Sequence, residues 1–226
     1  MRYVIVLSGD IRDDEAARAW LTGSDRVICV DGGARHLHRL GYAPDLLIGD
    51  LDSISPDDLA WISEKRIPIM RYPVEKDATD AELALTYAAG CLPDLRRDHE
   101  LVVLAALGSR PDHVLANQML AAGLAGQGWR LILTDGVSRV YTLAGGQTLH
   151  LSLPAPAAGL KWSLSAIPIT AVAAGLTYQD GLAYPLQRAT LTLGSSRGVS
   201  NSFTGVPEVE ISLEEGVILL IATPEQ

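Results

Sequence analysis

Hydrophobic positions follow two different patterns along the chain, and the change comes after about residue 137. Before it, continuous apolar runs such as VIVL and LVVLAAL alternate with helical patterns. Continuous apolar runs are typical of strands that are covered on both faces. We therefore expect strands at 2–8, 26–30, 45–49, 67–72, 101–107 and 130–134, separated by helices at about 13–22, 33–40, 55–65, 78–90 and 112–126.

After residue 137 the helical patterns stop, and short segments of alternating or apolar character follow. Glycine and proline separate these segments, which lie at 139–143, 147–153, 161–167, 171–174, 189–193, 208–213 and 217–222. Alternating strands and helices indicate a doubly wound α/β domain with a mostly parallel, Rossmann-like sheet. Short, evenly separated strands indicate an antiparallel sandwich or barrel-like domain. We predict an α/β domain over residues 1–138 and an all-β sandwich over residues 139–226.

Composition narrows the possible partners. The chain has 226 residues, 48% of them hydrophobic, and a net charge of −9, without the clustered lysine and arginine that a nucleic-acid partner requires. No apolar run reaches the roughly 20 residues of a membrane helix, so no membrane partner is expected. We interpret Cys29 and Cys91 as buried thiols without a disulfide. Together with the lack of a signal-peptide pattern, this favours a cytoplasmic location.

Acidic residues recur where the predicted strands of the first part end. They are Asp10, Asp31, Asp50, Asp52, Asp77, Asp80 and Asp112. Because the carboxyl ends of parallel strands lie along one edge of a sheet, carboxylates that are distant in sequence would meet there. So many acids together need a cation between them, which predicts a metal-dependent site.

The string GDLDS places Asp50 and Asp52 two residues apart. On an extended segment their side chains would point the same way, and Mg²⁺ prefers such hard oxygen ligands. A purely structural alternative makes Asp50 a turn residue and Asp52 a helix cap.

The string KDATDAEL opens a predicted helix and brings Asp77 and Asp80 to its start. Lys76 precedes the helix, where it could neutralise phosphate oxygens beside the free N–H groups of the first turn. Thr79 and Glu82 have the spacing of a capping box, and we interpret Glu82 as part of that cap.

The string GSRPDHVLAN repeats this arrangement at the next helix. Arg110 offers a planar fork for phosphate, Asp112 and His113 begin the helix, and Asn117 follows about one turn later. His113 could act as a general acid or base, but a hydrogen-bonding role is the stronger interpretation.

Two further strings contain candidate binding residues. Asp31, Gly32 and Gly33 lie between a strand and a helix, where glycine lets backbone N–H groups approach a phosphate or simply permits a tight turn. Ser200 and Asn201, in GVSN, could contact a polar organic ligand, although spacing alone favours a hairpin turn.

Taken in order, six strings resemble the thiamine pyrophosphokinase family along nearly the whole chain. They are DGGARHL, PDLLIGDLDSI, EKDATDAELAL, GSRPDHVLAN, GLAYPLQRATLTLG and GVSN. The resemblance implies an α/β catalytic domain followed by a β-sandwich, in a homodimer whose site is shared between chains. It also implies transfer of a pyrophosphoryl group from ATP to thiamine, which gives thiamine diphosphate and AMP.

The resemblance assigns roles to individual residues. It implies Mg²⁺ ligands at Asp50, Asp52, Asp77 and Asp80, nucleotide contacts at Lys76, Asp80 and Arg110, thiamine contacts at Asp112, Ser200 and Asn201, and catalytic roles for Lys76, Asp77, Arg110 and Asp112. We also predict nucleotide contacts at Asp31, Gly32, Gly33 and Asn117. Two positions depart from the family pattern. Ser109 stands where glycine is usual, and Ser202 stands where glutamate commonly follows the SN pair.

The residues suit direct in-line attack of the thiamine hydroxyl on the β-phosphorus, because the motifs contain acids, lysine and arginine but no evident covalent nucleophile. Two other functions fit part of the pattern. A metal-dependent phosphohydrolase would use the acids but leave the β domain and the SN pair without a role. A non-catalytic thiamine or nucleotide sensor would bind without turnover and would have little need for so many carboxylates.

Overall fold

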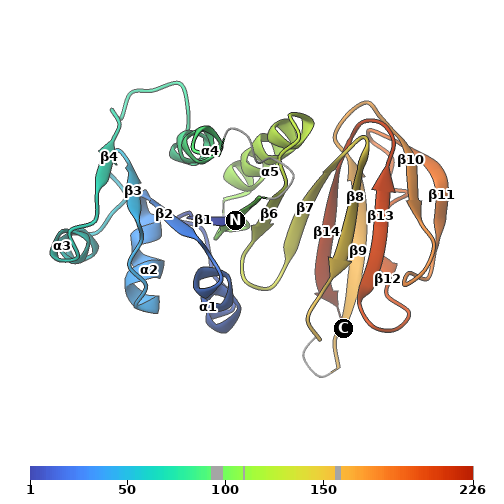
Figure 1. The fold of residues 1–226 in the computed structure, drawn as a ribbon, viewed down its shortest axis with the longest axis horizontal. Coiled ribbons are helices and arrows are strands. Elements are labelled where there is room, and N and C mark those ends of the chain that lie inside the picture. The colour runs from blue at the N-terminus through green and yellow to red at the C-terminus, as the bar shows by residue number, and fades with distance from the viewer. Residues whose placement is uncertain (93–98, 109, 156–158, 226) are drawn as a thin grey trace. The chain divides into compact units, whose positions relative to one another are not determined.

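The chain forms two compact units in a computed structural model that describes residues 1–92, 99–108, 110–155 and 159–225 (Figure 1). The first unit contains Met1–Leu120 and Leu131–Val137. The second contains Ala121–Arg130 and Ser138–Gln226. The second unit thus includes the end of a helix that starts in the first, and the domain limits 1–138 and 139–226 stay a prediction.

A parallel sheet forms the centre of the first unit. Its strands are β1 (Arg2–Val6), β2 (Arg26–Val30), β3 (Leu46–Gly49), β4 (Ile69–Arg71), β5 (Glu100–Leu104) and β6 (Leu131–Thr134), and they lie in the order β6-β5-β1-β2-β3-β4. Each neighbouring pair of these six strands is parallel. The chain runs from β1 to β4 in one direction and then returns to β5, on the other side of β1. Open α/β sheets bind ligands at such a reversal of strand order.

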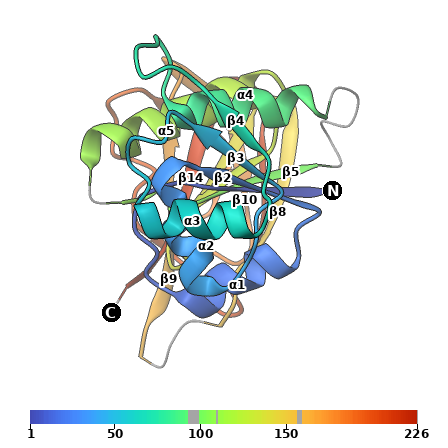
Figure 2. The same ribbon diagram turned by 90° about the vertical axis from the view of Figure 1, so that its left-hand side faces the viewer.

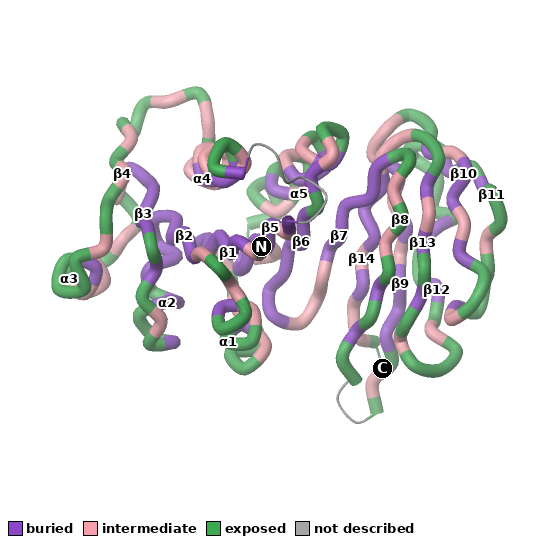
Figure 3. The backbone as a smooth tube through the Cα atoms, in the orientation of Figure 1, coloured by how far each residue is buried: buried purple, intermediate pink, exposed green. Residues whose placement is uncertain are grey.

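Helices cover both faces of this sheet, as Figures 1 and 2 show. The helices α1 (Asp14–Thr22), α2 (Ala34–Leu40) and α3 (Pro56–Glu64) lie on one face, and α4 (Asp80–Gly90) and α5 (Pro111–Gly126) on the other. This double cover explains the continuous apolar runs, because strands such as β1 and β5 are buried almost along their whole length (Figure 3). The α/β prediction is confirmed, while its Rossmann-like detail stays a prediction.

The helices begin where the sequence indicates. Ser55 caps α3 and Thr79 caps α4, each accepting a hydrogen bond from the backbone N–H three residues later. The Thr79 hydroxyl thus accepts from Glu82, as the capping box predicts. Pro111 is the first residue of α5, a position where its missing N–H costs nothing.

The second unit is an antiparallel β-sandwich, as predicted. Its strands are β7 (Arg139–Ala144), β8 (Gln147–Ser152), β9 (Lys161–Pro168), β10 (Val172–Tyr178), β11 (Leu186–Thr192), β12 (Asn201–Ser202), β13 (Glu208–Leu213) and β14 (Val217–Glu225). Two sheets result, β12-β9-β14-β7 and β11-β10-β13-β8, whose pairs are antiparallel. Their core includes Leu164, Leu176, Ile211 and Leu220, each at most 2% exposed.

The prediction that both cysteines are buried is correct for Cys29 and wrong for Cys91. Both thiols are free, but only Cys29 is buried, and burial raises its pKa. Cys91 is exposed and is the residue that follows the last residue of α4, Gly90. Among the described residues, no helix is long and apolar enough to cross a membrane.

Candidate active site

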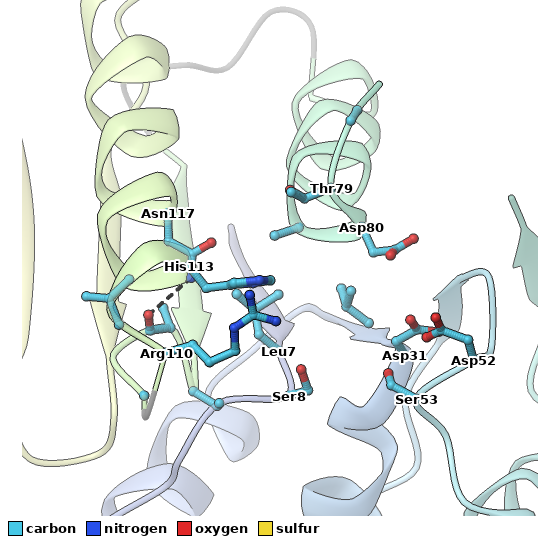
Figure 4. A pocket seen from close by; sticks show the side chains of 18 of the residues that line it. Leu7, Ser8, Asp31, Asp52, Ser53, Thr79, Asp80, Arg110, His113 and Asn117 are labelled. Carbon is cyan, nitrogen blue, oxygen red and sulfur yellow. Dashed lines mark hydrogen bonds between the residues drawn. The ribbon is translucent and has the colours of Figure 1, made fainter. Parts of the chain in front are cut away.

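A cavity of about 450 Å³ opens at the carboxyl ends of the parallel strands, where the strand order reverses between β1 and β5 (Figure 4). Its walls come from the segments that follow β1, β2, β3 and β5 and from the starts of α4 and α5. The lining includes Asp31, Asp52, Lys76, Asp80, Arg110 and Asn117, which are far apart in sequence. The structure therefore brings most of the predicted α/β site residues together at one place.

Asp31 has the most constrained position in this cavity. It is 6% exposed, and its backbone has a φ of +46°, a conformation that non-glycine residues seldom adopt. Its carboxylate accepts a 2.8 Å hydrogen bond from the N–H of Leu51. A Cβ atom on Gly49 would lie 2.3 Å from that carboxylate, so only glycine fits there. Burial, followed by the nearby carboxylates, raises the pKa of Asp31 to about 6.

Lys76 joins two of the predicted acids. Its ammonium lies 2.6 Å from Asp50 and 3.3 Å from Asp80. The hydrogen bond from Lys76 lowers the pKa of Asp50, and the same bond raises the pKa of Lys76. One carboxylate oxygen of Asp80 is buried and accepts no hydrogen bond from any described residue, although Lys76 is near enough to pair with it.

The segment that carries Asp50 and Asp52 is not extended, which corrects the prediction from their spacing. Leu51 between them has a φ of +71°, and the N–H of Asp52 donates to the carboxylate of Asp50 at 3.1 Å. Asp50 is therefore the turn residue of the structural alternative, but Asp52 does not cap α3, because Ser55 does. The negative charge of Asp50 raises the pKa of the exposed Asp52.

Three carboxylates form a group that could hold a metal ion. Asp31, Asp50 and Asp52 each offer an oxygen, and these oxygens all lie within 4.8 Å of one another. Figure 4 shows Asp31 and Asp52 side by side, with Asp80 on the facing helix. Oxygen-only ligands close together suit Mg²⁺. From the sequence, Asp31 could contact a metal, a ribose or only the turn, and it was assigned to the nucleotide contacts; its place after a strand is the same signal that marks Asp50.

Asp77 and Asp10 lie outside this group. Both are exposed, and neither lines the cavity or belongs to the carboxylate cluster. The predicted metal and catalytic roles of Asp77 stay predictions.

The start of α5 supplies the basic side of the cavity. Arg110 makes a two-point contact with Asp112, with distances of 2.6 and 3.3 Å. This contact raises the pKa of Arg110 and lowers that of Asp112. Arg110 and His113 line the cavity and point into it (Figure 4). Asp112 is exposed and does not line the cavity. Asn117 is buried and donates to the backbone oxygen of Ala106, which attaches α5 to the end of β5.

Glycine allows the backbone of the site to pack closely. A Cβ atom on Gly33 would lie 2.3 Å from the oxygen of Val6, and the N–H of Gly32 donates to Ser53 at 3.2 Å. The tight turn thus requires glycine at Gly33, while a Cβ atom on Gly32 would lie 3.0 Å from the oxygen of Ser53. Ser109, the first departure from the family pattern, lies outside the described residues.

The SN pair lies in the second unit, and its predicted thiamine contacts stay a prediction. Asn201 is 5% exposed, and its side-chain amide forms hydrogen bonds to both the N–H and the oxygen of Tyr184, at 3.0 and 2.8 Å. Tyr184 itself is 70% exposed. Ser200 is exposed and has a φ of +58°, and its N–H donates to Ser165. Asn201 therefore holds a loop that presents an aromatic ring, a role that the motif alone did not reveal.

Comparison with known proteins decides the family. The family description "Thiamin pyrophosphokinase, catalytic domain" matches residues 17–133, which is more than half of the chain. The chain belongs to the thiamin pyrophosphokinase family. A second description of the same family, "vitamin B1 binding domain", matches residues 157–218. The resemblance predicted from the sequence is confirmed, and with it the prediction of a transferase of the thiamine diphosphokinase type.

Individual thiamin pyrophosphokinases agree with this assignment over most of their length. The chain is 30% identical to the thiamine pyrophosphokinase of Bacillus subtilis (strain 168) over 200 residues, which cover 88% of this chain and 87% of the relative. A crystal structure of the Bacillus subtilis protein superposes with a TM-score of 0.84 at 25% identity, and both chains are covered completely. A family protein from Enterococcus faecalis gives a TM-score of 0.80 at 27% identity, also with complete cover of both chains.

Proposed function

We propose that this enzyme transfers a pyrophosphoryl group from ATP to thiamine with the help of Mg²⁺, producing thiamine diphosphate and AMP. The observation that carries the proposal is the group of Asp31, Asp50 and Asp52, with Lys76 between Asp50 and Asp80. Of these residues, all but Asp50 line the cavity at the reversal of strand order. A polyanionic substrate needs both cation-holding acids and direct cations in one site, and this cavity offers both.

The carboxylates fit the metal that the family implies. Asp31, Asp50 and Asp52 would hold Mg²⁺, and the buried, incompletely bonded oxygen of Asp80 faces the same cavity. When bound, Mg²⁺ supplies positive charge and ligand positions for phosphate oxygens. Asp77 stays in the proposal as a metal or catalytic residue on the strength of the family motif.

The chain's own residues bind and orient the reactants. Lys76 and Arg110 offset the negative charge of the triphosphate, and Gly32, Gly33 and Asn117 shape the backbone against which the nucleotide binds. Asp112 orients the thiamine hydroxyl or accepts its proton as that hydroxyl attacks the β-phosphorus in line with the departing AMP. Arg110 keeps Asp112 ionised, as an acceptor of that proton must be.

The proposal includes a thiamine contact in the second unit. The loop held by Asn201, with Ser200 nearby and the exposed ring of Tyr184, supports a thiamine contact in the second unit. We propose a homodimer in which one chain's cavity and the partner chain's loop form each site. The cytoplasmic location remains part of this proposal.

The direct test is incubation with ATP and Mg²⁺, with and without thiamine. We expect AMP and thiamine diphosphate in equal amounts, and neither product when thiamine is left out. Release of inorganic phosphate without thiamine would instead favour the phosphohydrolase, and binding of thiamine without turnover would favour the sensor.

A further inference from the structure

The turn after β1 is held by helix α2 in a way that the reaction described so far does not use. The guanidinium of Arg35 donates to the backbone oxygen of Ser8 at 2.6 Å and to that of Gly9 at 3.0 Å. The Nε2 atom of His36 lies 2.7 Å from the same oxygen of Gly9 and must be its donor, because a carbonyl oxygen only accepts. Two consecutive carbonyls are thus directed toward α2.

The surroundings of His36 favour its hydrogen bond to Gly9. Its side chain is buried, and its other ring nitrogen, Nδ1, has no hydrogen-bond partner among the described residues. Burial lowers the pKa of His36, which keeps the ring neutral and leaves the single proton on Nε2. A buried nitrogen without a partner costs free energy, so the contact with Gly9 is the interaction that accounts for a histidine at this position.

The opposite side of the same turn faces the cavity. Ser8 and Gly9 line the cavity, whereas Arg35 and His36 do not. In a trans peptide the N–H points away from the preceding C=O, and the described chain contains no cis peptide bond. Directing the oxygens of Ser8 and Gly9 toward α2 therefore turns the N–H groups of Gly9 and Asp10 away from α2, and of these two residues Gly9 lines the cavity. Neither N–H donates to any backbone oxygen in the described part of the chain.

The turn also has no room for side chains. A Cβ atom on Gly9 would lie 2.2 Å from the oxygen of Ala105, and one on Gly108 would lie 2.9 Å from the nitrogen of Asp10. Backbone therefore meets backbone at the point where β1 and β5 separate. Ser8 lies between Arg110 on one side and Asp31 on the other (Figure 4), so an anion bound here would lie between the basic and the metal-binding parts of the cavity.

We propose that the N–H groups of Gly9 and Asp10 bind a phosphate group of the nucleotide, and that Arg35 and His36 are positioning residues that direct these N–H groups. Successive backbone N–H groups that point into one concavity form a general anion-binding arrangement. This inference rests on the proposed function, because it assigns part of the polyphosphate to a specific place in the cavity.

Binding of inorganic tripolyphosphate, measured by calorimetry with Mg²⁺ present, tests the inference without turnover. Arg35 is exposed, and Arg35→Met removes two of the three hydrogen bonds to the oxygens of Ser8 and Gly9. We expect this variant to bind tripolyphosphate about tenfold more weakly, as the loss of a charge-assisted hydrogen bond does. The KM for ATP should rise by a similar factor, while the KM for thiamine stays unchanged.

Three matched variants separate positioning from general damage. His36→Leu should weaken tripolyphosphate binding, whereas His36→Gln should retain it, because the glutamine amide can donate from nearly the same place as Nε2. Arg39→Met serves as the control, since Arg39 lies on the same helix but pairs with Asp14 outside the cavity.

Unchanged tripolyphosphate binding in folded Arg35→Met and His36→Leu proteins would overturn the inference, and so would a wild-type protein that does not bind tripolyphosphate. Failure of the proposed function looks different, because the wild-type protein would then make no thiamine diphosphate at all.

Discussion

At the scale of single residues, Asp31 lowers the folding stability of the protein at the place where a ligand would bind. Its carboxylate is buried beside other acids, and its backbone adopts a left-handed conformation that costs of order 1–3 kcal/mol. Such strain persists where the surrounding structure enforces it, and here the N–H of Leu51 and the absence of a side chain on Gly49 do so. We infer that Asp31 is kept for binding and not for folding.

The first prediction follows from the raised pKa of Asp31. The ordinary value is 3.8 and the folded value is about 6, so between these pH values the folded protein binds more protons than the unfolded chain. The stability of the ligand-free protein therefore falls as the pH rises through this window, and the loss is complete above it. Asp31→Asn removes the charge but keeps an acceptor for Leu51. We expect it to raise the melting temperature at pH 8, but not at pH 3.5, by calorimetry.

A suitable control is Asp180→Asn, which changes an exposed acid of the second unit and should leave the melting temperature unchanged at both pH values. Equal melting temperatures of Asp31→Asn and wild type at pH 8 would contradict this account of Asp31.

The second prediction concerns the metal ligands. Asp52 belongs to the carboxylate group, while Asp77 is exposed and outside it. Asp52→Asn should raise the Mg²⁺ concentration for half-maximal activity at least about tenfold, in line with the loss of an ion ligand worth more than 1.4 kcal/mol. Asp77→Asn should cause a smaller shift. The measurement is activity against Mg²⁺ concentration at saturating substrates, and an equal or larger shift for Asp77 would favour the ligand set predicted from the sequence.

At the scale of elements, the sequence predicted well what depends on local pattern. Buried strands appear as continuous apolar runs, and Thr79 and Pro111 identify the starts of α4 and α5. Strand-end acids were expected to meet, and most do. What depends on long-range contact or unusual dihedrals was not predictable: the left-handed Leu51 has no local signal, and the attachment of Asn201 to Tyr184 joins residues 17 positions apart.

The third prediction concerns the loop that Asn201 holds. Asn201→Ala leaves the N–H and oxygen of Tyr184 without these partners, which should cost about 1–3 kcal/mol of unfolding free energy. Because the loop presents Tyr184, we expect the KM for thiamine to rise while the KM for ATP stays constant. Ser152→Ala is a matched control, since it removes only a surface hydrogen bond to Glu208 in the same unit. Equal changes in both KM values would contradict a thiamine-specific role for this loop.

At the scale of the whole molecule, the candidate site residues are distributed over both units. The acids, Lys76 and Arg110 belong to the first unit and the SN pair to the second, and each unit matches its own family description. If each site combines the first unit of one chain with the second unit of its partner, two differently damaged chains can restore one another.

The fourth prediction tests that shared site by complementation. Asp52→Asn and Asn201→Ala proteins are unfolded together, refolded as a mixture, and assayed at Mg²⁺ and thiamine concentrations at which each has low activity alone. In a mixed dimer one site carries both changes and the other carries neither. With half of the dimers mixed, the mixture should recover about one quarter of the wild-type activity, as the symmetry of a two-chain assembly requires. Activity equal to the mean of the two separate proteins would place each site within a single chain.

The central claim is that thiamine attacks the β-phosphorus of ATP in the cavity at the strand-order reversal. Its most direct test follows the fate of labelled phosphorus from ATP in the presence of Mg²⁺ and thiamine. We predict that a label in the β position appears wholly in thiamine diphosphate and a label in the α position wholly in AMP. Recovery of the β label in ADP, or of the γ label in inorganic phosphate without thiamine, would contradict the account.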